Sequence, residues 1–434
     1  MTPNRPHILV VGGGYVGMYA ALRLQRKLCR DEARITVVEP NSYMTYQPFL
    51  PEAAASNVEP RHVVVPLRPV LRECQVITGV VENLDHSRRI ATVRPRWGRP
   101  NEISYDVLVM AIGSIPRTLP IPGLAERAIG FKSITDATWL RNRVLTALDA
   151  AASSPDPRLR RRALTFVFVG GGFAGIEALA ELEDMASHAI RHYPALRRGD
   201  MRWVLVEAAN RIVPEVSEDL GRYTAERLLE RGIDVRLNTQ VTSLADDQVV
   251  LDDGSRFAAE TVVWTAGMRP HPLLEHTGLP LDDHKRLEAT AFLAVDGAAD
   301  AWTAGDCAAV PDLTRPGAWC APNAQHAVRQ AKVLADNVVA SMRGRPLRPY
   351  RHASAGAVAS LGRYQGVAEI YGVKLRGLPA WLMHRAYHIS RMPTLGRKLG
   401  VLADWTFVRR NVVSLGSLAE PRQDFEAIAA LQAA

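Results

Sequence analysis

The sequence predicts an α/β fold with two parallel sheets, chiefly because one glycine pattern occurs twice. Near the start, the apolar run ILVV leads into a glycine turn and then into helix-like residues, with the spacing Gly12-x-Gly14-x-x-Gly17. The same order returns after the run FVFV, with the spacing Gly170-x-Gly172-x-x-Gly175. A strand, a glycine turn and a helix in this order are typical of Rossmann-like dinucleotide-binding domains. We therefore expect two such domains in 434 residues, a length that allows two or three.

Each glycine of the first pattern has a physical reason. Gly12 permits the tight turn after the strand, Gly14 lets the backbone approach a pyrophosphate, and Gly17 lets the helix pack against the strand. The free N–H groups at the helix N-terminus hold the phosphates. The next apolar run, ITVV, ends in Glu39, where a carboxylate is expected to accept hydrogen bonds from a ribose hydroxyl. The alternative is an ordinary strand-to-helix turn.

The second pattern is complete in the same way, because the run WVLV ends in Glu207. Two complete patterns predict two dinucleotides, and two dinucleotides side by side indicate electron transfer between them. A structural duplication with one inactive site is the alternative.

Further strand ends fit this plan. A buried strand ends at Gly113, and Pro116, Pro120 and Pro122 then mark a crossover between domains. A short strand near 301–303 delivers Asp306 at its carboxyl end, where ligands of open α/β sheets bind. Alternatively, Asp306 caps the next helix. We expect one domain from 1–116 and 288–350, a second at 117–287, and a C-terminal segment at 351–434.

The composition is that of an ordinary globular protein, with 47% apolar and 23% charged residues. A strand follows the first six residues directly, which leaves no room for a secretory signal, and we expect no membrane-spanning helix. The 12 histidines and the four cysteines lack the spacing of a zinc site, so we predict no structural metal. We expect the cysteines to be reduced thiols, namely Cys29, Cys74, Cys307 and Cys320.

The C-terminal segment is strongly basic. Between Arg343 and Arg422 there are 14 Arg or Lys against three acids, an excess of 14 − 3 = +11, whereas the remainder carries 8 − 11 = −3. No nucleic-acid motif accompanies this charge, so anionic lipid is the expected partner. The segment predicts two helices separated by Pro393, and the second has an apolar stripe with basic neighbours: Val401, Leu402, Trp405, Val408 and Val412, with Arg397, Lys398, Arg409 and Arg410. Packing of this stripe inside the protein, or against a second copy, is the alternative.

Taken together, these residues resemble flavoproteins that bind two dinucleotides, related to the pyridine nucleotide-disulfide oxidoreductases. Within them, the chain is similar to the type II NADH:quinone oxidoreductases, which do not pump protons. The resemblance covers nearly the whole chain. It rests on the two patterns, the late Ala-Gly-Asp306 and further runs: Gln47–Leu50, Gly170–Glu177, Arg211–Pro214, Ala324-Gln325-x-Ala327-x-x-Gln330 and Gly377–Trp381.

The resemblance implies an NADH domain inserted in an FAD domain, with a basic amphipathic helical segment at the C-terminus. Non-covalent FAD would be held by Gly12, Gly14, Gly17, Glu39, Gly113 and Asp306. NADH, the substrate, would be held by Gly170, Gly172, Gly175 and Glu207. Glu177 would lie near the nicotinamide and the flavin, and Gln325 where flavin and quinone meet. The other implied partners are a menaquinone or ubiquinone, the cytoplasmic side of the cell membrane and a second copy of the chain.

Two features leave the function open. Glu177 stands at the start of a helix, where an acid either delivers protons or only interacts with the helix dipole. Moreover, the family usually has Gln-Gln-Gly where this chain has Arg329-Gln330-Ala331. This departure leaves the quinone site less well supported than the FAD and NADH sites. The alternatives are a soluble FAD-dependent NAD(P)H reductase or oxidase, a sulfide:quinone oxidoreductase, which needs a reactive cysteine pair, and a flavin-bound redox sensor.

Overall fold

The computed structural model describes residues 5–29 and 31–407, which form two compact units, each with a hydrophobic core of its own. Unit 1 comprises the described residues up to Tyr46, Val64–Arg117 and Gly267–Ala355, and unit 2 comprises Gln47–Val63, Thr118–Ala266 and the described residues from Gly356 on. As predicted, the second glycine pattern lies in an insertion within the first unit. The expected boundaries group the chain differently, because 267–287 lies in unit 1 and the described residues after 355 lie in unit 2.

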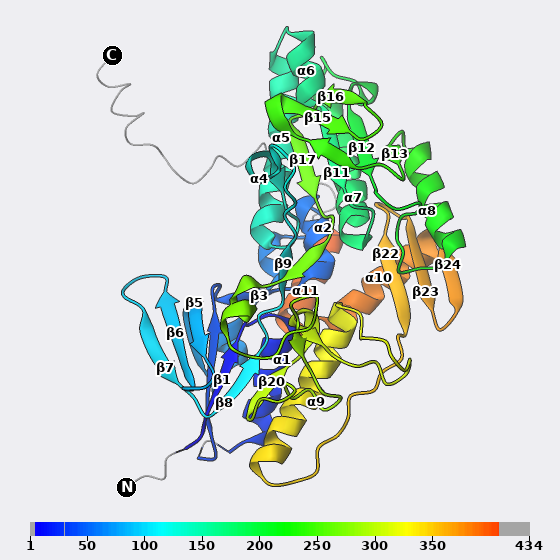
Figure 1. Ribbon diagram of the computed structural model, residues 1–434. Helices are drawn as coiled ribbons and strands as arrows, with labels where there is room; N and C mark the ends of the chain where they lie inside the picture. Colours follow the sequence, from blue (N-terminus) through cyan, green and yellow to red (C-terminus); the bar gives the residue numbers. More distant parts are fainter. Residues whose placement is uncertain (1–4, 30, 408–434) are drawn as a thin grey trace. The chain divides into compact units, whose positions relative to one another are not determined.

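Unit 1 is built on a seven-stranded sheet (Figure 1). β1 (His7–Val11) is buried along its whole length and lies between β2 (Arg34–Glu39) and β8 (Val107–Met110), in parallel register with both. The β-branched residues of these runs suit a sheet that is covered on both faces. The outer strands follow the order β20-β8-β1-β2-β5-β6-β7, with β20 (Ala301–Thr303), β5 (Gln75–Asp85), β6 (Ile90–Pro95) and β7 (Asn101–Ser104).

Two helices of unit 1 lie side by side, α1 (Tyr15–Lys27) and α9 (Ala324–Met342) (Figure 1). The Arg23 guanidinium donates to both carboxylate oxygens of Asp336, at 2.6 and 2.7 Å, which ties the two helices together. The smaller elements of this unit are β3 (Tyr43–Thr45), β4 (Val64–Pro66), α3 (Leu67–Val70), β9 (Ser114–Pro116), β18 (Met268–Pro270), β19 (Leu287–Glu288) and β21 (Ala308–Ala309).

Unit 2 contains a second parallel sheet, in the order β10-β17-β11-β12-β13. Its central strand β11 (Thr165–Val169) is fully buried and carries the second glycine pattern at its end. The other strands are β10 (Ala128–Ile129), β17 (Thr261–Trp264), β12 (Arg202–Val206) and β13 (Asp234–Arg236). A three-stranded antiparallel sheet follows, with β14 (Val241–Ser243), β15 (Gln248–Leu251) and β16 (Arg256–Ala258).

Helices of unit 2 bring distant parts of the chain together. α7 (Phe173–Ala189) contacts α2 (Leu50–Ala54), α5 (Ile134–Ser153) and β22 (Gly356–Ser360). α10 (Leu378–Arg391) packs on β22, β23 (Gly366–Ile370) and β24 (Val373–Arg376) (Figure 1). The remaining helices are α4 (Leu124–Arg127), α6 (Pro157–Ala163), α8 (Glu218–Glu230) and α11 (Leu395–Phe407).

The two helices expected around Pro393 are confirmed as α10 and α11, but the predicted outward stripe is wrong for Val401 and Trp405. Val401 is fully buried, and Trp405 donates its indole N–H to Glu52 at 2.6 Å, so both face the interior of unit 2. Leu402, which also belongs to the predicted stripe, is exposed, and so are Leu395 and Leu399. The other stripe positions, Val408, Arg409, Arg410 and Val412, lie outside the described residues. Within 5–29 and 31–407, no helix has the length and apolar character needed to cross a bilayer.

Candidate functional site

The first glycine turn joins β1 to α1 and leaves no room for larger residues. Gly12 has φ +102°, a conformation that L side chains rarely adopt. A Cβ on Gly17 would lie 1.7 Å from the Gly12 carbonyl oxygen, so the first helical turn touches the strand end directly. The backbone angle at Gly12 and the close approach at Gly17 give the sequence pattern its physical basis in this chain.

The acid at the end of β2 is hydrogen-bonded to the same turn. Glu39 Oε2 accepts from the Gly13 N–H at 2.6 Å, and its Oε1 accepts from the Asn41 N–H at 3.2 Å. A Cβ on Gly13 would approach the Glu39 Cγ to 2.9 Å, so this glycine lets the acid reach the turn. Sequence reasoning missed Gly13, although the unbroken run Gly12-Gly13-Gly14 was a visible signal.

The second turn repeats this geometry in unit 2. Gly170 has φ +111°, and a Cβ on Gly175 would lie 2.2 Å from the Gly170 carbonyl oxygen. Glu207 at the end of β12 accepts from the Gly171 N–H at 2.5 Å and from the Ala209 N–H at 2.7 Å. Each unit therefore holds a complete turn together with its acid.

Both helices that follow these turns begin on a glycine, Gly14 for α1 and Gly172 for α7. Neither N-cap glycine has a side chain that could cap its helix, whereas Ser133 caps α5 and Asn323 caps α9. A Cβ on Gly14 would meet nothing within 4 Å, so the start of α1 has open space that fits the phosphates of a dinucleotide. At the start of α7, the Glu215 carboxylate accepts from the Phe173 N–H.

The carboxyl edge of the unit 1 sheet gathers the other residues predicted for this ligand. β20, β8, β1 and β2 are neighbours, and Asp306, Gly113, Gly12 and Glu39 stand at or just after their carboxyl ends. The Ser114 hydroxyl donates to Asp306 Oδ2 at 2.8 Å, which fixes the acid at this edge. Ligands of open α/β sheets bind at this edge, so the four residues stand where such a ligand is expected.

Gln325 lies in the first turn of α9, in unit 1. Its Oε1 accepts from the Ala355 N–H at 2.9 Å and contacts His352 Nε2 at 2.8 Å. The second glutamine of the same run, Gln330, is buried and accepts from the Gly305 N–H at 2.8 Å. The Ala-Gln run is therefore connected to the turn that carries Asp306.

Glu177 lies in unit 2, on the buried side of α7. Its Oε1 accepts from the Ser360 N–H at 2.8 Å and lies 3.1 Å from His384 Nε2. Burial raises the pKa of Glu177 to about 8, and burial lowers the pKa of His384 to about 3. At neutral pH the contact therefore joins a protonated acid to a neutral imidazole. An acid that only stabilises a helix dipole would be a carboxylate, so this state favours a role in holding a proton.

Sequence reasoning missed the groups around Glu177. Glu52 on α2, Glu181 on α7 and His384 on α10 are each almost fully buried. They lie far apart in the sequence, except for Glu181, which follows Glu177 by one helical turn. That i, i+4 spacing was the one signal available.

All four cysteines lie among the described residues and are free thiols. Burial raises the pKa of Cys74 to about 12 and of Cys320 to about 11, and burial also raises the pKa of Cys307. A thiolate is the reactive form of cysteine, so these three thiols are not activated.

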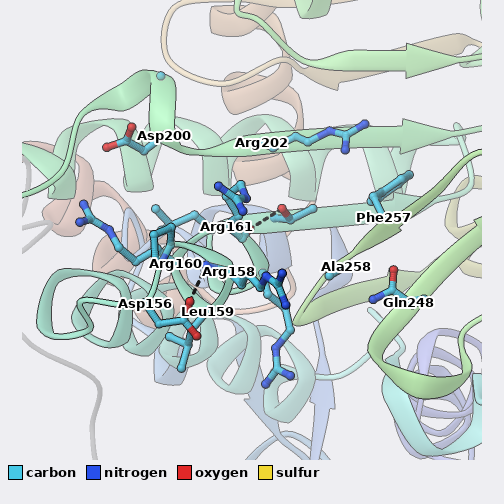
Figure 2. A pocket seen from close by; sticks show the side chains of 15 residues that line it. Asp156, Arg158, Leu159, Arg160, Arg161, Asp200, Arg202, Gln248, Phe257 and Ala258 are labelled. Atoms are coloured by element: carbon cyan, nitrogen blue, oxygen red, sulfur yellow. Dashed lines mark hydrogen bonds between the residues drawn. The ribbon is translucent and has the colours of Figure 1, made fainter.

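A groove of about 970 Å³ lies beside α6 in unit 2. Figure 2 shows Arg158, Arg160 and Arg161 around it, and the Arg202 guanidinium lies 4.2 Å from the centre of the Phe257 ring. The described residues that line it include none of the predicted site residues. The groove is thus separate from the glycine turn of its own unit.

The family model for pyridine nucleotide-disulphide oxidoreductases matches residues 6–331, which include both glycine turns, Glu177, Asp306 and Gln325. The chain belongs to this family. Membership identifies it as an oxidoreductase that binds a flavin and a pyridine nucleotide, in agreement with the two glycine turns.

Curated relatives extend over nearly the whole chain. A type II NADH:quinone oxidoreductase of Mycobacterium tuberculosis is 29% identical over 93% of this chain and 88% of its own length. A demethylphylloquinone reductase of Synechocystis sp. is 28% identical over 93% of this chain and 96% of its own. The solved structure of NDH2 from Plasmodium falciparum in complex with NADH shares the fold, with a TM-score of 0.86, 17% identity and coverage of 94% of this chain and 98% of that chain.

The first turn yields a matched pair of substitutions. Gly17→Ala forces the turn apart, so we expect the cofactor-free protein to lose about 1–3 kcal/mol of stability and to melt at a lower temperature. Gly14→Ala meets no atom within 4 Å, so the melting temperature of the cofactor-free protein should hold, while flavin content falls because the new methyl occupies the ligand's space. Thermal melts measure the stability of each variant, and flavin absorbance measures its flavin content. Equal melting temperatures for the two variants would contradict this account.

Proposed function

We propose that the chain is an NADH:quinone oxidoreductase that does not pump protons. The observation that carries the proposal is the presence of two complete glycine turns in one chain, each with its own acid. Two dinucleotides in one protein serve electron transfer from one to the other. The names of the curated relatives support NADH as donor and a quinone as acceptor.

In this proposal, unit 1 holds one non-covalent FAD and unit 2 holds NADH. When bound, FAD accepts the hydride and delivers two electrons to the quinone. The chain's own share is to bind the phosphates at α1 and α7, to orient the riboses on Glu39 and Glu207, and to exclude water. The FAD residues are Gly12, Gly14, Gly17, Glu39, Gly113 and Asp306, and the NADH residues are Gly170, Gly172, Gly175 and Glu207.

Two side chains are proposed to act at the reacting end. Glu177 holds a proton at neutral pH in a buried place, which suits an acid that supplies protons during the reaction. The Gln325 carbonyl oxygen is held by two partners, so its amide nitrogen has a fixed direction and can orient a quinone oxygen.

Steady-state NADH oxidation tests the function. The purified protein should be yellow with one FAD per chain, and a short-chain quinone should accelerate NADH oxidation well above the rate with oxygen alone. Sulfide should not replace NADH, because the buried thiols are not activated. A protein that stays colourless in the presence of FAD would overturn the whole proposal. Fast turnover with oxygen and no response to quinone would indicate a soluble oxidase, and slow turnover with every acceptor would indicate a redox sensor.

The preference for NADH follows from Glu207. Its carboxylate accepts from the adenosine 2′-hydroxyl but repels a 2′-phosphate. The nearby cation that could offset this repulsion, Arg211, donates to the carbonyls of Val213 and Val216. We expect kcat/KM for NADH to exceed that for NADPH by about tenfold or more, which corresponds to about 1.4 kcal/mol. Glu207→Gln should narrow this ratio. The matched change Glu39→Gln, in the other turn, should lower FAD content and leave the ratio per bound FAD unchanged. Equal kcat/KM values in the unaltered protein would show that Glu207 does not contact the ribose.

We also propose that α10 and α11 dock on the cytoplasmic side of the cell membrane. Their exposed large apolar side chains are Leu378, Leu382, Met383, Leu395, Leu399 and Leu402. Arg391 on α10 and Arg397 and Lys398 on α11 supply positive charge, worth about 1 kcal/mol per residue near an anionic surface. A homodimer belongs to the same proposal, and sedimentation velocity would measure its mass.

Co-sedimentation with liposomes tests the docking face. Binding should require anionic lipid and weaken at high salt, because surface charges are screened. Leu399→Glu should reduce binding, since it places a carboxylate in the apolar face. Leu229→Glu on α8 is the matched control, because Leu229 is 56% exposed and Leu399 is 57% exposed. If Leu399→Glu and Leu229→Glu bind the liposomes equally well, the exposed face of α11 is not the docking face.

A further inference from the structure

Glu215, in the loop after β12, lies at the start of α7, where the proposed function places the pyrophosphate of NADH. Its carboxylate accepts from the N–H of Phe173, the first residue of α7. A Cβ built on Gly172, which precedes the helix, would lie 3.7 Å from Glu215 Oε1. A negative charge therefore already occupies part of the space in which a dinucleotide needs to place its own negative phosphates.

The glycine turn of unit 1 differs from that of unit 2 at this place. Within the part of the chain that the structure describes, a Cβ built on Gly14, the counterpart of Gly172, would meet nothing within 4 Å. The two turns otherwise agree, because each donates a glycine N–H to the acid at the end of the next strand, Glu39 or Glu207. The difference falls at the second glycine of the pattern, where the backbone approaches a pyrophosphate, so it bears on the ligand.

The backbone beneath Glu215 is held by a tight turn. The Val216 N–H donates to the Val213 carbonyl oxygen at 3.2 Å, which leaves Pro214 and Glu215 as the two central residues. Proline at the first central position is typical of such a turn. The Arg211 guanidinium also donates to the carbonyl oxygens of Val213 and Val216, at the two ends of the turn. The loop therefore presents Glu215 at a fixed place.

Val213, which begins this tight turn, has an unusual backbone conformation. Its φ is +43°, a region that β-branched residues rarely adopt, and its side chain is fully buried. Its N–H donates to the Gly171 carbonyl oxygen at 2.7 Å, and a Cβ on the same glycine would lie 2.7 Å from Ile212 Cγ2. The loop is thus fixed directly to the glycine turn. Backbone strain of this kind persists where the surrounding structure enforces it, and it is concentrated at ligand sites.

The side chain of Glu215 is exposed, so it can turn into water although its backbone is fixed. This movement breaks the hydrogen bond to Phe173 and removes a carboxylate from the helix N-terminus, where negative charge is favourable. A pyrophosphate restores both interactions, because it accepts from the same N–H groups. One anion can therefore replace the other without a change in the backbone.

We propose that Glu215 occupies the pyrophosphate position at the start of α7 in the nucleotide-free protein and that NADH displaces it on binding. This inference rests on the proposed function for the position of NADH, but it does not depend on the electron acceptor. The competition weakens the binding of NADH and of NAD⁺ alike, because both carry the same pyrophosphate. Its consequence is faster release of NAD⁺ after the hydride has been transferred.

Two other roles of Glu215 predict different results. An acid that only stabilises the helix N-terminus would affect stability but not the affinity for the nucleotide. An acid that accepts from a ribose hydroxyl would strengthen nucleotide binding, as is proposed for Glu207. The three roles therefore differ in the effect that loss of the acid has on affinity.

Calorimetric titration of the FAD-loaded protein with NAD⁺ distinguishes these roles, because NAD⁺ binds without reducing the flavin. Glu215→Gln keeps the size of the side chain and removes its charge, and Glu215→Ala removes the carboxyl group altogether. Glu218→Gln is the matched control, because Glu218 is an exposed acid at the first position of α8 and its loss changes the net charge equally. We expect the Kd for NAD⁺ to fall by about threefold to tenfold in both Glu215 variants and to stay within about 1.5-fold in Glu218→Gln.

Thermal melts give the second readout. Without nucleotide, both Glu215 variants should melt about 1–3 °C lower than the unaltered protein, because α7 loses the acid at its N-terminus. Saturating NAD⁺ should remove or reverse this difference, since the pyrophosphate then supplies the negative charge. Lower stability together with tighter binding supports displacement, whereas a variant that is merely damaged would lose both.

An unchanged or raised Kd for NAD⁺ in either Glu215 variant would overturn the inference. If the unaltered protein reduces quinone with NADH in that case, the proposed function stands. If NADH reduces the flavin but quinone is not reduced, the proposed function fails, while tighter binding of NAD⁺ by the two variants would still support displacement. If the unaltered protein binds no NAD⁺ at millimolar concentration, both the proposed function and the inference are overturned.

Discussion

One hydrogen bond, made twice, sets the geometry on which both cofactor sites depend. The N–H of the middle glycine donates to the acid at the end of the next strand, from Gly13 to Glu39 in unit 1 and from Gly171 to Glu207 in unit 2. This bond holds the acid beside the turn, and the turn sets the direction of the helix N-terminus. In the proposed binding mode, ribose and phosphates would meet groups already in place, so little ordering entropy would be lost when a dinucleotide binds.

The glycine turns could be predicted because their information is local. The positive φ of Gly12 and the close approach of Gly17 to its carbonyl depend on residues within five positions of each other. The parallel sheets follow from the same pattern, since a strand, turn and helix repeat as one unit. The acid network could not be predicted, because Ser360 meets Glu181 across 179 positions and Asn57 meets it across 124. No spacing rule links such residues; only the packing of α2, α7 and β22 brings them together.

The inward position of two predicted stripe residues on α11, Val401 and Trp405, has a physical cause. Leu395, Leu399 and Leu402 follow helical spacing as closely as Val401 and Trp405 do, so the helix has apolar residues on both sides. Periodicity detects apolar faces but does not say which one is buried. The inward face here also carries a carboxylate, Asp404, which accepts from the Glu59 N–H at 3.0 Å and contacts His62 Nδ1 at 2.6 Å. Asp404 lowers the apparent hydrophobicity of the buried face. Only the structure shows that its hydrogen-bond partners lie in unit 2.

The C-terminal helices therefore have one face packed inside unit 2 and one face that is proposed to dock on lipid, and removal of the segment cannot distinguish the two roles. The inward face places His384 beside Glu177 and brings Arg385 and the Trp405 indole to Glu52. A chain that ends at Arg376 would lose these partners and leave the buried Glu52 without its Arg385 ion pair, at a cost of about 3–5 kcal/mol. Such a chain would lose lipid binding through unfolding, whether or not the outward leucines touch the membrane. Only single substitutions on the outward face, with the inward contacts intact, connect a loss of binding to the docking surface.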